Sequence, residues 1–357
     1  MSTARLPPIF PIEAADPSVQ SSFFNELELP KVQKFIKDRE CPDHTFPPSC
    51  DVNLFFGLFF DGTNNNLERD EAEHAHSNVA RLYGAFPGLR DKHGSEPWPD
   101  FSNKYHKSFF RTYVPGLGTK FKEVGDTGEG FSTITSDRAK GLAFAYKAEN
   151  RILWAMVQTI NNVYRYYLGV PLVDDKEFLD SLNKLSLPGY LEESAQLREA
   201  FSSLLQRLHK ALVTYLPVGP GKTKDKGVVK AIFVSLFGFS RGAAEARAFV
   251  NWFIWLCKLD ASLTCREGLS IGSIPVTIDF MGIFDTVASV GIAATAKIGD
   301  GHQAWADAEK SLRFPLDSGP KECLHIVSAH EIRRSFPLDS LLSFGTMPPG
   351  CSEIVFP

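Results

Sequence analysis

The sequence lacks the features that mark nucleic-acid-binding and zinc proteins. Its 38 basic side chains are outnumbered by 42 acidic ones, the net charge is −4, and no basic block stands out. Electrostatics therefore gives no reason to expect a nucleic-acid partner. The six cysteines form no C-x-x-C pair and have no histidines at ligand spacing, so neither a metal site nor another cofactor is expected. Free buried thiols are the default for such cysteines, and disulfides in an oxidising compartment are the alternative.

Long apolar runs are also missing. The longest, from Ala248 to Leu256, is interrupted by Asn251 and lies well short of the ~20 residues that a membrane-spanning helix requires. The first residues carry Pro7 and Pro8 and lack the apolar centre of a secretory signal. Neither a transmembrane helix nor a signal peptide is expected, and any export must use another route.

The residues that are present suit a large folded domain. The 357 residues are 43% hydrophobic and 22% charged, which excludes a disordered or fibrous chain. Prolines interrupt residues 1–50 repeatedly, so this part is predicted to be an N-terminal arm and residues 51–357 to be one α/β domain. The 29 phenylalanines cluster beside the expected strands and indicate an aromatic core, with a lipid-facing groove as the alternative.

The order of apolar runs predicts a mostly parallel sheet flanked by helices. Short runs rich in Val, Ile and Phe that end at turn residues indicate strands, and apolar residues at helical spacing indicate helices. In such an α/β fold, functional residues lie at the carboxyl ends of the strands. The expected strands are 52–60, 109–114, 228–237, 275–284 and 353–356, and the expected helices are 141–167, 243–258 and 325–334.

The most informative motif is Gly238-Phe239-Ser240-Arg241-Gly242, which joins a predicted strand to a predicted helix. A serine on such a sharp turn needs a glycine two residues before it and two after it, because side chains there would collide with neighbouring backbone. The turn exposes the serine hydroxyl as a nucleophile and directs the next N–H at an oxyanion. The alternative is an ordinary Gly-Ser turn that closes a buried strand.

An acid is expected after the serine. A serine reacts when a histidine takes its proton and an acid orients that histidine, and in α/β hydrolases the chain order is Ser, then Asp or Glu, then His. Asp285 lies at the carboxyl end of the strand that follows Ser240, where the acid belongs. A helix N-cap is the alternative role for Asp285. Asp279 competes for the acid's role from a position inside the strand.

The histidine is harder to place. After Asp285 the chain contains His302, His325 and His330. The last two lie in a predicted helix, whereas the catalytic base normally sits in a loop just after the last strand, which here would begin at Pro357. The catalytic base is therefore expected beyond Pro357. Within the chain, His330 is the alternative candidate for this role.

Two backbone donors are expected to form an oxyanion hole. Arg241 follows the nucleophile and supplies the first donor, and Gly62 and Thr63, in the loop after the first strand, fit the second by position. Asp61 is predicted to anchor this loop by accepting backbone hydrogen bonds. A simple Asx-capped turn is compatible with the same residues.

Residues 171–227 are predicted to form a helical insertion before the nucleophile strand. Two interpretations stay open for its main helix: it packs on the sheet, or it is a lid over the active site. The helix carries an apolar stripe of Leu197, Phe201, Leu204, Leu205, Leu208 and Leu212.

Two other patterns are rejected. Phe59 occupies the position of the nucleophilic aspartate in the D-x-D-G-T phosphatase motif. Gly221-Lys222-Thr223 lacks the leading glycine of a P-loop, because that position is Leu216, and it precedes a strand instead of a helix.

Five spaced blocks resemble, in their order, the phospholipase effectors of bacterial type VI secretion systems. The match runs from about Val52 to Pro357 and covers neither residues 1–50 nor the insertion. The segment 325–336 also resembles a His-containing helix of that family. The five blocks are Phe60–Asn66, Asn78–Tyr83, Tyr113–Thr119, Gly238–Ala243 and Phe284–Val287.

The resemblance implies an α/β-hydrolase catalytic domain with Ser240 as nucleophile and Asp285 as orienting acid. It implies a lipolytic enzyme that hydrolyses membrane phospholipid esters after a secretion spike or delivery protein brings it to the periplasm of a competing bacterium. It also implies an immunity protein in the producer. The family places its histidine in a Gly-x-His-Ser-Asp-Val-Gly-Gly block after a strand like 353–357, so the chain is expected to be a fragment.

Two other functions remain open from the sequence. One is a non-catalytic module that binds an immunity or delivery partner through the insertion or the N-terminal arm. The other is a soluble carboxylesterase of the same fold. A preference for bilayers over short soluble esters distinguishes a lipase from that esterase.

Overall fold

The computed structural model describes residues 30, 51–90, 108–128, 137–185, 194–213, 215, 228–288, 306, 311–330, 338–342 and 345–356. The chain divides into two compact units, residues 1–49 and 50–357. All strands and helices named below belong to the second unit.

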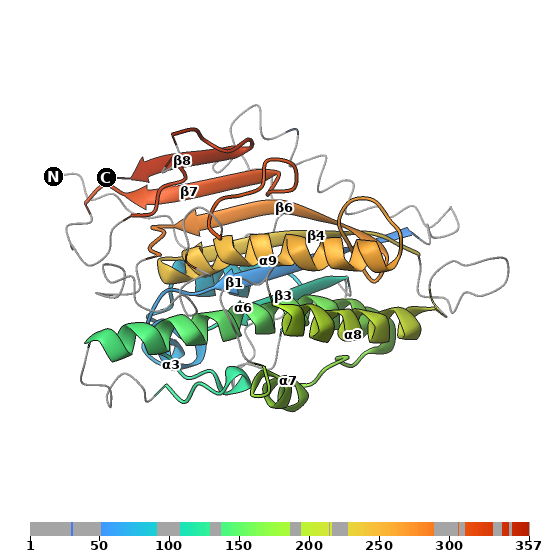
Figure 1. Cartoon of the computed structure of the whole chain (residues 1–357). Coiled ribbons are helices and arrows are strands. Elements are labelled where there is room, and N and C mark those ends of the chain that lie inside the picture. Colours follow the sequence, from blue (N-terminus) through green and yellow to red (C-terminus); the bar gives the residue numbers. More distant parts are fainter. Residues whose placement is uncertain are drawn as a thin grey trace. The chain divides into compact units, whose positions relative to one another are not determined.

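A mostly parallel sheet lies at the centre of this unit (Figure 1). Its strand order is β2-β3-β1-β4-β6-β7-β8, and the short β5 pairs antiparallel with β6. The other neighbours are parallel. The strands are β1 (Asp51–Phe60), β2 (Leu89–Arg90), β3 (Phe109–Val114), β4 (Val228–Phe239), β5 (Ser270–Ile271), β6 (Ile274–Phe284), β7 (Glu322–Ser328) and β8 (Cys351–Phe356).

Helices cover both faces of the sheet. Successive side chains of a strand point to opposite faces, and β1 divides accordingly: Leu58 and Phe60 join the core with α6, α8 and α9, whereas Phe59 packs with Tyr83 of α4. Figure 1 shows α6, α8 and α9 together in front of the strands. The helices are α3 (Leu67–Glu71), α4 (Asn78–Ala85), α6 (Asp137–Leu168), α7 (Asp175–Leu182), α8 (Ala195–Leu212), α9 (Arg241–Leu263) and the 3-10 turn η1 (Lys122–Val124).

The predicted fold class is confirmed. All five predicted strands are present, as β1, β3, β4, β6 and β8, and the helices predicted at 141–167 and 243–258 are α6 and α9. The nucleophile strand β4 lies between β1 and β6, at the middle of the sheet. The loops that follow these three strands therefore meet at one place on the carboxyl edge.

The helix predicted at 325–334 is wrong over its described residues. Residues 322–328 are strand β7, which pairs with β6 on one side and β8 on the other. Cys323, His325 and Val327 are buried, and the residues between them are more exposed, which is the alternation of a strand. The apolar residues of this short segment fit both periods, and the two neighbouring strands decide between them.

The main helix of the insertion packs within the helical layer. The apolar stripe of α8 is buried, and the ring of Phe201 lies 5.9 Å from that of Trp255 on α9. Leu208 and Leu212 contact the turn at Gly272, which precedes β6 at the amino edge of the sheet. These contacts favour the packed helix over the lid, because they lie away from the carboxyl edge.

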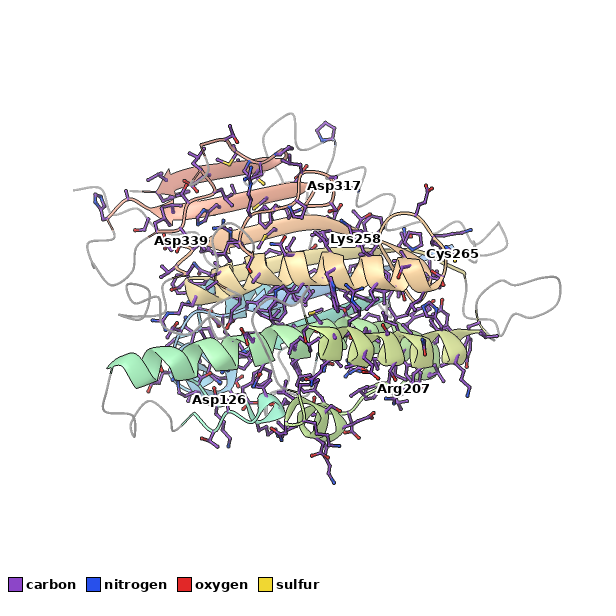
Figure 2. The ribbon with its side chains drawn as sticks, viewed as in Figure 1. Asp126, Arg207, Lys258, Cys265, Asp317 and Asp339 are labelled. Atoms are coloured by element: carbon purple, nitrogen blue, oxygen red, sulfur yellow. The ribbon has the colours of Figure 1, made fainter. Side chains whose placement is uncertain are left out.

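In the part of the chain that the structure describes, no helix combines the length and the apolar character needed to cross a bilayer. The same residues contain no group of three or more His, Cys, Asp or Glu side chains placed to hold a metal ion. The exposed Cys265, just past the end of α9, lies at the opposite end of that helix from Arg241 (Figure 2).

Candidate active site

Ser240 lies in the sharp turn between β4 and α9. Its φ of 54° and ψ of −121° are rare for a residue with a side chain and persist only where the surrounding structure holds them. The N–H of Ser240 donates to the carbonyl of Phe284 at 2.9 Å, and its carbonyl accepts from Ala243 at 3.1 Å and Val287 at 3.2 Å. Its hydroxyl makes no capping bond to α9. The serine is thus strained, fixed from two sides and not used as a helix cap.

The two glycines of the motif allow the close approaches that the turn requires. A Cβ atom on Gly238 would lie 2.6 Å from the Cα of Ala243. On Gly242 it would lie 2.3 Å from the carbonyl oxygens of Phe60 and Asp61. The start of α9 therefore rests directly on the backbone that leaves β1, and this contact brings the serine turn and the loop after β1 together.

Replacing Gly242 by alanine is expected to lower the free energy of unfolding by about 3 kcal/mol, because rigid backbone must move to admit the methyl group. Chemical denaturation measures this. Gly169→Ala is the control: its Cβ meets nothing within 4 Å, although φ is +80°, so it should cost only about 1 kcal/mol. Equal losses in the two variants would contradict the close packing at Gly242.

The loop after β1 is built on the buried carboxylate of Asp61. One oxygen of Asp61 accepts the N–H of Gly62 at 2.7 Å, and the other accepts the hydroxyls of Ser77 at 2.7 Å and Tyr113 at 2.6 Å. Burial raises the pKa of Asp61, and the hydrogen bonds from Tyr113 and Ser77 oppose that shift. Asp61 thereby links the loop to β3 and to the start of α4.

This network bears on the choice between Gly62 and Thr63, the two residues expected to fit the second donor's position. The N–H of Gly62 is committed to Asp61, because the carboxylate folds back onto the next residue. The N–H groups of Asn64 and Asn65 also have acceptors, the carbonyls of Leu117 and Gly62. The N–H of Thr63 has no acceptor among the described residues. Thr63 is therefore the residue of this loop whose N–H can face an oxyanion, together with Arg241 at the first position of α9.

Asp285 is a second strained residue beside the first. Its φ is 44°, and it follows β6 directly. The N–H of Asp285 donates to the carbonyl of Ile326, and its carboxylate accepts the N–H of Ser328 at 2.6 Å. The competing Asp279 is exposed and lies 3.7 Å from Lys321. Strained residues cluster at functional sites, so the geometry supports Asp285 over Asp279.

Asp285 faces a cavity of about 460 Å³. Phe239 and Phe356 form part of one wall, and His76 and Arg81, at the start of α4, form part of another. Sequence reasoning did not find His76 or Arg81, because only the fold brings the start of α4 to this edge. The block at 78–83 was noted in the sequence, but nothing in it indicated a role.

His325 is a buried structural residue. Its Nδ1 lies 2.8 Å from Oε2 of Glu353, and the backbone N–H of Thr286 donates to its Nε2 at 3.2 Å. A backbone N–H can only donate, so Nε2 is an acceptor and Nδ1 carries the proton. Burial lowers the pKa of His325 below its ordinary value. The neutral ring holds the residue after Asp285 in place.

The other candidate base that the structure describes is His330. His330 is exposed in the turn that follows β7, and among the described residues it makes no hydrogen bond to Ser240 or Asp285. His302 lies outside the described residues. The loop that follows Asp285 is instead held by Asp339, whose carboxylate accepts the N–H of Ala288 at 2.6 Å, and which lies at the arrowhead end of the strands in Figure 2.

Lowering the pH below about 6.5 is expected to destabilise the fold through His325. The unfolded histidine binds a proton there and the buried one resists it, so the free energy of unfolding falls until the pH reaches the lowered pKa of the folded state. The lowered pKa of Glu353 adds a further loss below its ordinary range. Denaturation at a series of pH values should show a flatter dependence in His325→Gln than in the wild type. A wild-type slope in His325→Gln would contradict this assignment.

Comparisons with known proteins show which family the chain is similar to. The family model of the catalytic domain of Tle1-like phospholipase effectors of the type VI secretion system matches residues 56–254, more than half of the chain. This stretch contains both the loop after β1 and the serine turn. No curated protein matches the chain.

Two solved structures are similar to the chain. An uncharacterized protein from Pseudomonas aeruginosa is 28% identical over 94% of this chain, with a TM-score of 0.63. A Tle1 effector bound to the VgrG spike from the type VI secretion system is 19% identical over 86% of this chain, with a TM-score of 0.39. The chain spans 44% and 51% of the lengths of these two proteins.

Proposed function

We propose that this chain, which belongs to the family of Tle1-like phospholipase effectors of the type VI secretion system, is the serine hydrolase part of an enzyme that cleaves ester bonds of membrane phospholipids. The observation that carries the proposal is the backbone of Ser240, held at φ 54° and ψ −121° between two obligatory glycines. The second residue of a type II′ turn has the same conformation but is normally glycine, whereas a nucleophilic serine in a strand-to-helix turn adopts it despite its side chain.

The proposed chemistry is acyl transfer. The Oγ of Ser240 attacks the acyl carbonyl while a histidine takes its proton, and the N–H groups of Arg241 and Thr63 stabilise the oxyanion. Collapse of the tetrahedral intermediate expels the lysophospholipid alkoxide, which takes the proton back from the imidazolium. Water then releases the fatty acid by the reverse sequence of proton transfers.

Asp285 is proposed to orient the histidine. We place that histidine after Pro357, as the resemblance implies. The end of β8 supports this position, because Phe356 lines the same cavity that Asp285 faces. A residue that follows β8 closely enters that cavity with a short connection.

Membership of the family supports the biological setting. We propose that a secretion spike or delivery protein carries the effector to the periplasm of a target bacterium, and that an immunity protein protects the producer. In that setting the substrate is the phospholipid of the target cell's membranes.

A fluorophosphonate probe on the protein extended past Pro357 tests the mechanism. Labelling of Ser240, loss of labelling in Ser240→Ala, and unchanged labelling in Ser181→Ala, an exposed serine of α7, are expected. A folded protein that is not labelled would overturn the proposal. Hydrolysis of short soluble esters in preference to phospholipid vesicles would instead identify a carboxylesterase of the same fold.

A further inference from the structure

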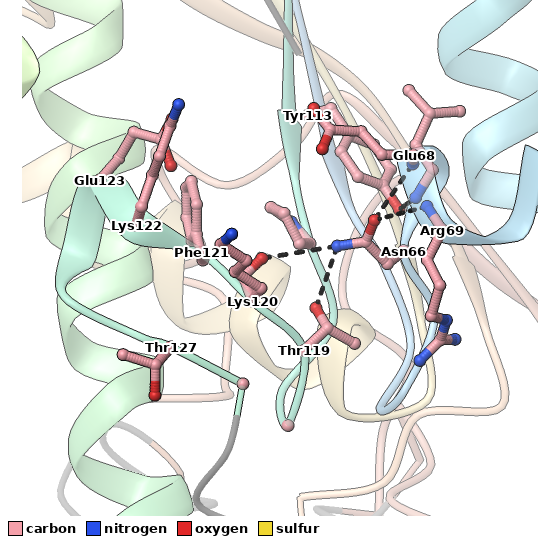
Figure 3. Close-up of a pocket in the computed structure, with 14 residues that line it drawn as sticks. Asn66, Glu68, Arg69, Tyr113, Thr119, Lys120, Phe121, Lys122, Glu123 and Thr127 are labelled. Carbon is pink, nitrogen blue, oxygen red and sulfur yellow. Dashed lines mark hydrogen bonds between the residues drawn. The ribbon is translucent and has the colours of Figure 1, made fainter. Parts of the chain in front are cut away.

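A second cavity, of about 560 Å³, opens at the carboxyl edge beside the loop after β1. One wall is the end of that loop and α3, including Asn66 and Glu68, and the other is the loop after β3, including Lys120 and Lys122 (Figure 3). Asn66 stands three residues after Thr63, the proposed oxyanion donor. The cavity therefore begins where the reacting ester would be held.

Hydrogen bonds within the protein connect the two walls of this cavity. The side-chain amide of Asn66 donates to Oγ1 of Thr119 at 3.4 Å and to the carbonyl of Lys120 at 3.5 Å, which links the two walls. Behind them the buried Arg151 pairs with Asp126 at 3.0 Å and donates to the carbonyl of Thr119 at 3.1 Å. The backbone beside Lys120 is thus held from two sides, by Asn66 and by Arg151.

Charges of both signs lie on opposite walls of the cavity and have no ion-pair partner among the described residues. Lys120 and Lys122 are exposed on one wall and Glu68 is exposed on the other, and within the described part of the chain none of the three forms an ion pair. Figure 3 shows the lysines and Glu68 on opposite sides. Arg69 differs, because it pairs with Asp70 at 2.7 Å. Glu123, on the lysines' wall, is buried.

We propose that this cavity binds the headgroup of a zwitterionic phospholipid, with the phosphate beside Lys120 and Lys122 and a terminal ammonium beside Glu68. A neutral acylglycerol has no charged group that could pair with these side chains. An anionic headgroup without an ammonium group has no cation that could pair with Glu68. The charged side chains of the lining suit a headgroup better than an acyl chain, because burying them against hydrocarbon is costly. The proposal rests on the proposed function, because it makes this cavity the headgroup site of the same reaction.

Hydrolysis of vesicles by the protein extended past Pro357 tests the assignment. The double variant Lys120→Gln/Lys122→Gln should lower kcat/KM about tenfold on both phosphatidylethanolamine and phosphatidylglycerol, and leave 4-nitrophenyl butyrate unchanged. Glu68→Gln should lower the rate about threefold on phosphatidylethanolamine alone. The control Lys176→Gln/Lys184→Gln removes two exposed lysines near α7 and should change none of the rates. If the control lowers kcat/KM as much as Lys120→Gln/Lys122→Gln does, the assignment of this cavity as the headgroup site is wrong.

A binding measurement separates this inference from the mechanism. The Ser240→Ala protein should bind glycerophosphoethanolamine in a calorimetric titration, and the added Lys120→Gln/Lys122→Gln pair should abolish the heat of binding. Binding that survives the pair, or that inorganic phosphate displaces at equal concentration, would overturn the zwitterion site. The two experiments can also disagree. If the headgroup binds as expected but the probe does not label Ser240, the headgroup site is supported and the proposed mechanism is wrong.

Discussion

Replacing Ser240 by glycine is expected to abolish hydrolysis and at the same time to stabilise the fold. The serine is held at φ 54° and ψ −121°, a conformation whose strain is of order 1–3 kcal/mol for a residue with a side chain. Glycine adopts it without steric cost but loses about 0.5–1 kcal/mol of chain entropy on folding. The net gain in free energy of unfolding is expected to be about 1 kcal/mol.

The matched variant is Ser240→Ala, which removes the same hydroxyl and keeps the strain. The hydroxyl makes no capping bond, so its loss should leave the stability near that of the wild type. Both variants should lose on the order of 10⁴-fold or more in kcat. Denaturation curves and fatty-acid release, both measured on the protein extended past Pro357, report the two effects. A glycine variant less stable than the alanine variant would show that the turn stores no strain, and would weaken the case for a nucleophile.

Much of this site could be predicted from local sequence because its demands are steric. Gly238 and Gly242 have no space for a Cβ atom. A turn that needs a glycine on each side of a serine can therefore be recognised in the sequence by its Gly-x-Ser-x-Gly spacing. The segments of β1, β4 and β6 are apolar runs of strand length. These runs predict where the strands end, and therefore which loops lie at the carboxyl edge of the sheet. Asp285 was predicted from its position at that edge and from the chain order Ser, then Asp or Glu, then His.

What local pattern could not supply is set by contacts between distant segments. The segment at 322–328 fits helix and strand alike, and becomes β7 because β6 and β8 flank it. The sequence offers Gly62 and Thr63 for one donor position in the loop after β1, and only the fold shows that the N–H of Gly62 is bonded to the Asp61 carboxylate. Nothing near Lys120 in sequence indicates that it faces Glu68 across a cavity.

Arg151 is the clearest case of a residue that only the fold reveals. It lies in the middle of α6, fully buried, and forms an ion pair at 3.0 Å with the buried Asp126. Its side chain also donates to the carbonyls of Pro115 and Thr119. It therefore holds residues 115–126 of the loop after β3, in which Gly116 rests on the backbone of Gly62.

Replacing Arg151 by methionine is expected to lower the free energy of unfolding by about 3–5 kcal/mol, because Asp126 stays buried without its charge partner. The change should also reduce hydrolysis, since the loop after β3 positions the loop that carries Thr63. Chemical denaturation measures the first effect, and kcat on phospholipid vesicles measures the second in the fraction that remains folded.

Arg207→Met is the matched control, because its ion pair with Glu177 is short, at 2.6 Å, but half exposed. An exposed pair contributes about 0–1 kcal/mol, so this variant should unfold close to the wild type. The double variant Arg151→Met/Asp126→Leu removes both buried charges and should recover part of the loss, since the penalty comes from the unpaired carboxylate. If the double variant is no more stable than Arg151→Met, the loss comes from the carbonyls of Pro115 and Thr119, and the loop is held by those hydrogen bonds.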